Sequence, residues 1–219
     1  SGIARYSLGF AHPNQLGLRI FQFVLCSLYL KRKKISFGKM LMVLFAAAFC
    51  YLVPNSQTAS LSLAALFILL GGHLLVKRYV STQNRMFVNG MIVATGAVNI
   101  GSIALSLIDV TEFPTLSTFD RILSSRFSYC HEDYLLYGIK IFGNRIYVSE
   151  AEQALVGITR KLFLDNAYMH LLLWYGVITW LICSAMYLIN MVNQKNEGND
   201  IMVIILFLYA IYGIMESGL

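Results

Sequence analysis

Long stretches of the chain carry no charged residue. Residues 86–108 and 167–192 contain none, and each stretch is long enough to cross a hydrocarbon core of about 30 Å as a helix. Backbone amides in lipid must be hydrogen-bonded within their own segment, so apolar stretches of this length are typical of helices. The pattern predicts an all-α, polytopic membrane protein with six spans, at residues 15–30, 40–53, 58–76, 86–108, 167–192 and 201–215.

The composition and the placement of the basic residues agree with this prediction. Hydrophobic residues make up 58% of the 219 residues and charged residues 13%, about half the charged share of a soluble domain. The net charge of +6 does not indicate nucleic-acid binding, because nine Lys and Arg residues fall in three short turns, 31–39, 77–85 and 193–200. Because successive connections lie on alternating sides of the membrane, these three turns fall on the same side. The positive-inside bias assigns that side to the cytoplasm.

The segment 109–166, on the opposite face, is the longest connection between the predicted spans. It holds eight of the eleven acidic residues, and a connection of this length is usually functional or disordered. The apolar positions of residues 119–142 fall on one arc about 140° wide at 100° per residue. We therefore expect an amphipathic helix there, lying on the membrane or on the helix bundle.

Two charged side chains interrupt this apolar arc. Arg126 and Asp133 fall inside it, whereas Arg121 and Glu132 fall on the solvated side. A charge on an apolar face costs free energy unless it is paired or binds a ligand. Arg126 and Asp133 are therefore either an ion pair that holds the helix or part of a binding site.

The remaining features concern metals and the extent of the chain. Three of the four cysteines lie in apolar runs, Cys130 is alone in its loop, and no spacing typical of zinc ligands occurs. The cysteines thus give no indication of a zinc site. The chain is interpreted as one membrane domain, residues 1–219, and as an internal piece of a longer protein, because it starts without methionine and ends directly after an apolar run.

Three motifs make the chain similar to a known family. The first is Arg5-Tyr-Ser-Leu-Gly-Phe-Ala-His12-Pro-Asn14-Gln-Leu-Gly17. The second is Phe119-Asp-Arg-Ile-Leu-Ser-Ser-Arg126-Phe followed by Ile141-Phe-Gly143, and the third is Leu164-Asp165-Asn166-Ala-Tyr168 with Gly176 further on. Together they resemble the motifs of bacterial Wzy-type polysaccharide polymerases, which belong with the O-antigen ligases among lipid-linked glycosyltransferases.

The resemblance implies a polymerase of lipid-linked oligosaccharide repeat units at the outer face of the bacterial inner membrane. In that family a glycan on a polyprenyl pyrophosphate is transferred to the hydroxyl of an acceptor sugar. The resemblance therefore implies that no metal and no cofactor take part. The implied partners are this lipid-linked oligosaccharide, the lipid bilayer and a chain-length regulator protein, without nucleic acid. An O-antigen-type ligase is the enzymatic alternative, and a transporter or flippase for glycolipids is the alternative from another class.

The resemblance also implies residues that bind the pyrophosphate. Arg5 and Arg126 are the first candidates, since a guanidinium is permanently charged and offers two donors to a phosphate. Many relatives carry another arginine in a Ser-Arg-Thr motif where this chain has Ser56-Gln57-Thr58. Arg19, one turn inside the first span, is the candidate substitute, or else a side chain that extends to the membrane surface.

A general base completes the implied site. Asp165 occupies the position of a His-Asn pair in the related ligases and is the candidate base that takes the proton of the acceptor hydroxyl. The residues alone leave open that Asp165 is a helix N-cap, for which Asp is well suited. His12 is the second catalytic candidate, with a turn histidine ahead of the first span as its alternative. Supporting roles are expected for Asn14, Asp133 and Asn166.

Overall fold

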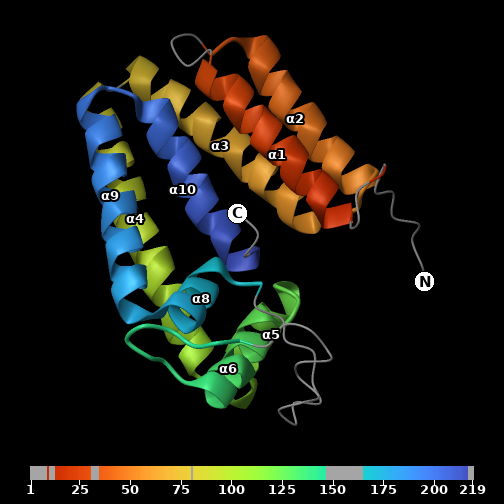
Figure 1. Cartoon of the computed structure of the whole chain (residues 1–219). Coiled ribbons are helices and arrows are strands. Elements are labelled where there is room, and N and C mark those ends of the chain that lie inside the picture. Colours follow the sequence, from red (N-terminus) through yellow and green to blue (C-terminus); the bar gives the residue numbers. More distant parts are fainter. Residues whose placement is uncertain (1–8, 10–12, 31–34, 80, 147–164, 217–219) are drawn as a thin grey trace. The chain divides into compact units, whose positions relative to one another are not determined.

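A computed structural model describes residue 9 and residues 13–30, 35–79, 81–146 and 165–216 (Figure 1). Within these ranges all regular elements are helices, and no strand occurs. The chain divides into two compact units. Unit 1 comprises the residues up to Ala94 together with Asn190–Tyr212, and unit 2 comprises Thr95–Ile189 together with the residues from Gly213 onward.

Unit 1 is a bundle of apolar helices. It contains α1 (Pro13–Leu30), α2 (Phe37–Leu52), α3 (Gln57–Tyr79), the first part of α4 (Ser81–Leu107) and most of α10 (Asp200–Met215). The hydroxyl of Ser60 on α3 donates to the carbonyl of Ala47 on α2 at 3.0 Å. The ring of Phe21 on α1 stacks on that of Tyr212 on α10, with ring centroids 4.7 Å apart. The helices are thus joined by apolar packing and by hydroxyl-to-backbone hydrogen bonds, as expected for membrane bundles.

Unit 2 surrounds a second core. It contains the rest of α4, the short helix η1 (Val110–Glu112), α5 (Pro114–Ile122), α6 (Arg126–Tyr137), α8 (Ala167–His170), the π-helical turn η2 (Leu171–Tyr175) and most of α9 (Gly176–Asn196). One hydrophobic cluster in this unit is formed by buried residues of α4, α6, the segment after α6, α8 and η2: Ile103, Cys130, Ile146, Met169, Leu172 and Leu173. Figure 1 shows α4 and α9 side by side.

A polar contact fixes α4 against α9 within the apolar surroundings. The indole nitrogen of Trp180 donates to Asn99 Oδ1 at 2.9 Å, and Asn99 Nδ2 donates to the hydroxyl of Ser184 at 2.8 Å. Each of these groups would cost free energy in an apolar environment without its partner. The contact therefore sets the register of the two helices.

The apolar runs predicted the positions of the long helices. Five of the six predicted spans each coincide with one helix. Because α3 continues to Tyr79 and α4 begins at Ser81, most of the predicted turn 77–85 is helical. Three described segments are long and apolar enough to cross a membrane: Gln57–Val76, Arg85–Leu107 and Ala167–Asn196. The apolar helices Phe37–Leu52 and Asp200–Met215 are shorter. The crossing of all six helices stays a prediction.

The expected amphipathic helix over residues 119–142 is wrong as a continuous element. The chain forms two helices, α5 and α6, separated at Ser124 and Ser125, which both have positive φ angles of 63° and 58°. A residue with left-handed backbone interrupts an α-helix, so positions before and after the break do not share one helical phase. Phe127 is buried as expected, whereas Phe119 and Ile122 are exposed, and the expected contact of these two side chains with lipid stays a prediction.

The predicted span 167–192 is also interrupted. Gly176 has a φ of 88° and a ψ of 174°, so α9 begins as a new helix after η2. The 21 residues of α9 have a length of about 30 Å at 1.5 Å per residue, which matches a hydrocarbon core. Residues 167–175 are therefore not needed for crossing, and they contribute to the core of unit 2.

Candidate functional site

Asp120 fixes the start of α6, the helix that carries Arg126 and Asp133. The Asp120 carboxylate is buried and accepts from the backbone nitrogens of Phe127 at 2.8 Å and Ser128 at 3.2 Å, and from the Ser128 hydroxyl. These nitrogens belong to the first turn of the helix, where no intrahelical acceptor exists. A negative charge there also interacts favourably with the helix dipole. Asp120 was not among the residues singled out from the sequence.

Arg126, the first residue of α6, lies in a mostly buried environment. Its Nη2 is 3.5 Å from Glu216 Oε1, and the two side chains are 11% and 19% exposed. Its other terminal nitrogen, Nη1, is buried and has no hydrogen-bond partner among the residues that the structure describes. The ion pair seen for Arg126 is thus with Glu216 and not with Asp133, which follows two helical turns later. Glu216 was missed because it is far away in sequence.

Asp133 is the most deeply buried carboxylate on α6. Its side chain is 0% exposed, and burial raises the pKa of this carboxyl from 3.8 to about 7. The cause is desolvation, which disfavours the charged form. Asp133 therefore exchanges a proton close to neutral pH.

Cys130 lies close to both candidate carboxylates. Burial, the largest cause, and the charges of Asp133 and Asp165 raise the pKa of its thiol to about 12, while hydrogen bonds with the Asn166 backbone and the Ser106 side chain act in the opposite direction. A thiol in this environment stays protonated and is not a nucleophile. Asp133 and Asp165 each lie near enough to this thiol to act on it electrostatically, and the Asn166 backbone forms a hydrogen bond with it. Asp165 itself is partly exposed.

The N-cap of α8 is Asn166 and not Asp165. Asn166 Oδ1 accepts from the backbone nitrogens of Tyr168 at 3.0 Å and Met169 at 3.3 Å. Its Nδ2 donates to the hydroxyl of Ser102 on α4 at 2.7 Å. An amide side chain can accept and donate at once, which a carboxylate cannot do. The interpretation of Asp165 as a cap is therefore wrong, and its carboxylate is not needed for the cap.

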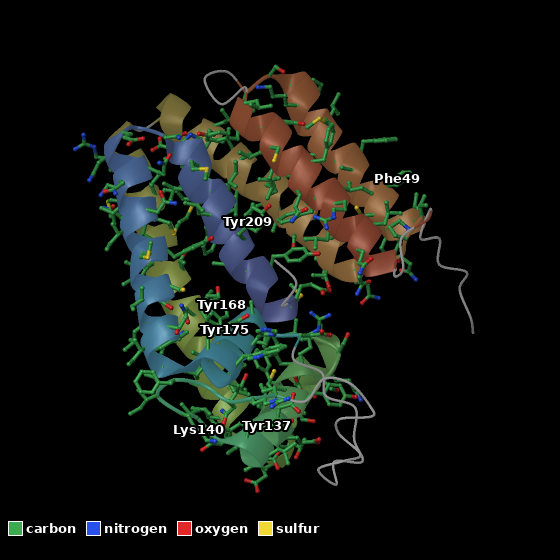
Figure 2. All side chains as sticks on the ribbon, viewed as in Figure 1. Phe49, Tyr137, Lys140, Tyr168, Tyr175 and Tyr209 are labelled. Atoms are coloured by element: carbon green, nitrogen blue, oxygen red, sulfur yellow. The ribbon has the colours of Figure 1, made fainter. Side chains whose placement is uncertain are left out.

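The segment after α6 joins the two sides of the break at Gly176. The backbone nitrogens of Val177 and Ile178, in the first turn of α9, donate to the carbonyls of Lys140 at 3.1 Å and Ile141 at 3.4 Å. Asn144 donates to the carbonyl of Leu173 from its backbone nitrogen at 2.9 Å and from Nδ2 at 3.0 Å. These bonds satisfy groups that the helix ends leave free. Figure 1 shows the segment beside α8, and Figure 2 labels Lys140 and Tyr175 on the joined chains.

Two glycines permit this close backbone contact. A Cβ on Gly143 would lie 2.1 Å from the Trp174 carbonyl oxygen, and a Cβ on Gly176 would lie 2.3 Å from the nitrogen of Gly143. Both glycines also have positive φ angles. Gly143 and Gly176 belong to the motifs that resemble the polymerase family, and in this chain they lie against each other.

The other candidate residues lie elsewhere. Arg5 and His12 are outside the described residues. Asn14 lies in the first turn of α1 and is partly buried, and Arg19 on α1 is exposed and donates to Gln22 Oε1 at 2.9 Å. Both belong to unit 1, whereas Arg126, Asp133, Asp165 and Asn166 belong to unit 2. Within the described ranges no three His, Cys, Asp or Glu side chains are grouped closely enough to hold a metal ion.

The helices and their composition define an all-helical, membrane-associated protein. Comparison with protein-family models, with curated proteins and with solved structures finds no match.

Proposed function

We propose that the protein is a glycosyltransferase of the membrane surface that polymerises lipid-linked oligosaccharide repeat units. The observation that carries the proposal is Arg126, a mostly buried arginine whose Nη1 has no hydrogen-bond partner in the described part of the chain. A buried guanidinium donor without an acceptor costs free energy, and a phosphate oxygen is an acceptor that matches it. The motifs that resemble the polymerase family support the same assignment.

In the proposed reaction the acceptor hydroxyl attacks the anomeric carbon of the lipid-linked glycan. The carbon–oxygen bond to the pyrophosphate breaks, and the polyprenyl pyrophosphate leaves with the electron pair. Arg126 stabilises the charge that develops on the leaving group. A carboxylate takes the proton of the hydroxyl.

Asp165 is the proposed base, and Asp133 is the second candidate. Asp165 is partly exposed and can be reached by an acceptor, whereas Asp133 is fully buried. Asp133 nevertheless has the pKa of about 7 that suits a general base. The two carboxylates lie around Cys130, so both belong to one part of unit 2.

A transporter or flippase is the alternative from another class. Transporters place charged residues or helix breaks near the middle of the membrane. The break that the structure has in a long apolar segment lies at Gly176, the first residue of α9, and the candidate residues of unit 2 lie around α6 and α8. This placement favours chemistry at the membrane surface.

Substitutions at Arg126 test the phosphate-binding role. In cells whose polysaccharide depends on the protein, Arg126→Ala should abolish polymer ladders on gels. Arg126→Lys should restore them poorly, because lysine keeps the charge without the two-donor fork. Arg121→Ala, on the exposed end of α5, is the matched control and should be tolerated.

Glu216→Gln separates phosphate binding from the ion pair. It breaks the Arg126–Glu216 pair but leaves the guanidinium in place, so it should retain most polymer formation. Equal defects in Glu216→Gln and Arg126→Ala, at equal protein levels, would reduce Arg126 to a structural residue.

Asparagine substitutions distinguish the two carboxylates. In purified protein supplied with lipid-linked repeat units, Asp165→Asn should slow turnover by about 10²–10⁴-fold without a change in melting temperature, since Asn166 provides the cap. If Asp133 is the base instead, Asp165→Asn remains active, and Asp133→Asn removes a rise in rate through about pH 7. Normal turnover in both variants contradicts both assignments.

A further inference from the structure

The segment between α6 and residue 146 has an apolar edge that no described residue covers. Phe142 is 84% exposed, the largest value among the large hydrophobic residues that the structure describes, and Ile141 is 60% exposed. Ile139 is also exposed. Exposed apolar side chains gathered in one short segment are typical of a contact with lipid or protein.

The position of this segment relative to α9 identifies the contact. The carbonyls of Lys140 and Ile141 accept from the first backbone nitrogens of α9, so the segment lies at the end of that helix. The same helix has a row of exposed apolar side chains on its surface: Ile178, Leu181, Ile182, Met186 and Ile189. Only 17% of the most apolar window in Ala167–Asn196 is buried inside the protein, which is typical of a surface that faces lipid. Ile141, whose carbonyl accepts from the backbone nitrogen of Ile178, and Phe142 next to it add two exposed apolar side chains at the end of that helix.

Neighbouring side chains indicate the depth of the segment. Trp174 and Tyr175 precede α9, and Trp and Tyr are enriched where membrane spans reach the interface with water. Lys140 and Arg145 are exposed on the same segment, and long cationic side chains at this level extend to lipid phosphates. The segment thus combines apolar, aromatic and cationic side chains in the arrangement found at the lipid interface.

We propose that residues 139–142 insert into the bilayer interface beside α9, with Phe142 among the acyl chains and Lys140 at the phosphates. Hydrogen bonds from Val177 and Ile178 to the carbonyls of Lys140 and Ile141 tie the segment to α9. Because the segment directly follows α6, its insertion also fixes α6 relative to the membrane surface. This role concerns lipid contact and does not depend on the proposed transfer reaction.

Site-directed spin labelling tests the insertion. Cys26 and Cys183, the exposed cysteines, are replaced by serine, and the full chain with Phe142→Cys is labelled and reconstituted in phosphatidylcholine–phosphatidylglycerol vesicles. The label at 142 should be relaxed strongly by oxygen, which concentrates in lipid, and weakly by a water-soluble nickel chelate. Met186→Cys on α9 is the lipid control, and Glu132→Cys on the exposed side of α6 is the water control.

The ratio of the label's accessibility to oxygen to its accessibility to the nickel chelate shows whether lipid, water or protein surrounds position 142. A ratio at position 142 several-fold above that at position 132, and closer to that at position 186, supports insertion. A ratio equal to that at position 132 overturns the proposal. Low accessibility to both reagents means that protein covers Phe142 and also overturns it, and line broadening that disappears on dilution with unlabelled chain identifies the cover as a second copy.

Discussion

The buried carboxyl of Asp133 should make the stability of the protein depend on pH, and Asp133→Asn should remove that dependence. Folding raises the pKa from 3.8 to about 7, so the folded state keeps a proton that the unfolded state releases between these values. Stability is therefore lost as the pH rises from about 4 to about 7 and changes no further above it. The difference of about 3 pH units corresponds to at most about 4 kcal/mol.

Asparagine has a similar shape and carries no charge at any of these pH values. The variant should match the wild type near pH 4 and become more stable than it as the pH rises, by about 8–16 °C in melting temperature at pH 8 for a chain of this length. The assay is thermal unfolding of the purified protein in detergent between pH 4 and 9. Leu135→Asn, at an exposed and uncharged position of α6, is the control and should give a difference that does not vary with pH. A pH-independent difference for Asp133→Asn, or a loss of stability at pH 8, would refute the reasoning.

Two further predictions concern the frame that holds α6. Asp120→Ala removes the carboxylate that caps α6 and leaves buried backbone nitrogens without acceptors, so it should cost about 2 kcal/mol or more in unfolding free energy, measured by denaturant or thermal unfolding. Gly143→Ala places a Cβ against the Trp174 carbonyl and should destabilise far more than Gly138→Ala, which also has a positive φ but open space around it. Equal melting temperatures for the two alanine variants would show that the backbone contact at Gly143 is not maintained.

The hydrophobic pattern predicted the long helices because a backbone in an apolar environment must form its hydrogen bonds within its own segment, and a helix does this. It did not predict the break between α5 and α6. The helical wheel assumes a constant 100° per residue, and Ser124 and Ser125 interrupt that phase with left-handed backbone. The acceptor that compensates for the break is Asp120, a residue whose partners lie seven and eight positions later. A local periodicity analysis does not weigh such a contact.

The choice between Asp165 and Asn166 shows a second limit. Both residue types are good N-caps, so their order in the sequence does not decide which one caps α8. In the structure Asn166 also donates from Nδ2 to the hydroxyl of Ser102 on α4, a contact 64 residues away that the local sequence does not reveal. The ion pair between Arg126 and Glu216 is likewise a tertiary contact that the local sequence does not predict. Arg126 and Asp133 were correctly expected on a buried face, since that expectation needed only the phase within α6.

The contacts of unit 2 place the candidate residues on a well-fixed frame. Asp120 holds the start of α6, Asn166 joins α8 to α4, and the bonds across Gly143 and Gly176 tie the end of α6 to α9. Catalytic groups are effective when the elements that carry them are held by packing and hydrogen bonds of their own. Each of these contacts uses groups that a helix end leaves free, so the breaks in the helices supply the bonds that hold the candidate residues in place. A substitution at a joining residue should therefore lower the melting temperature and turnover together, whereas Asp165→Asn should lower turnover alone.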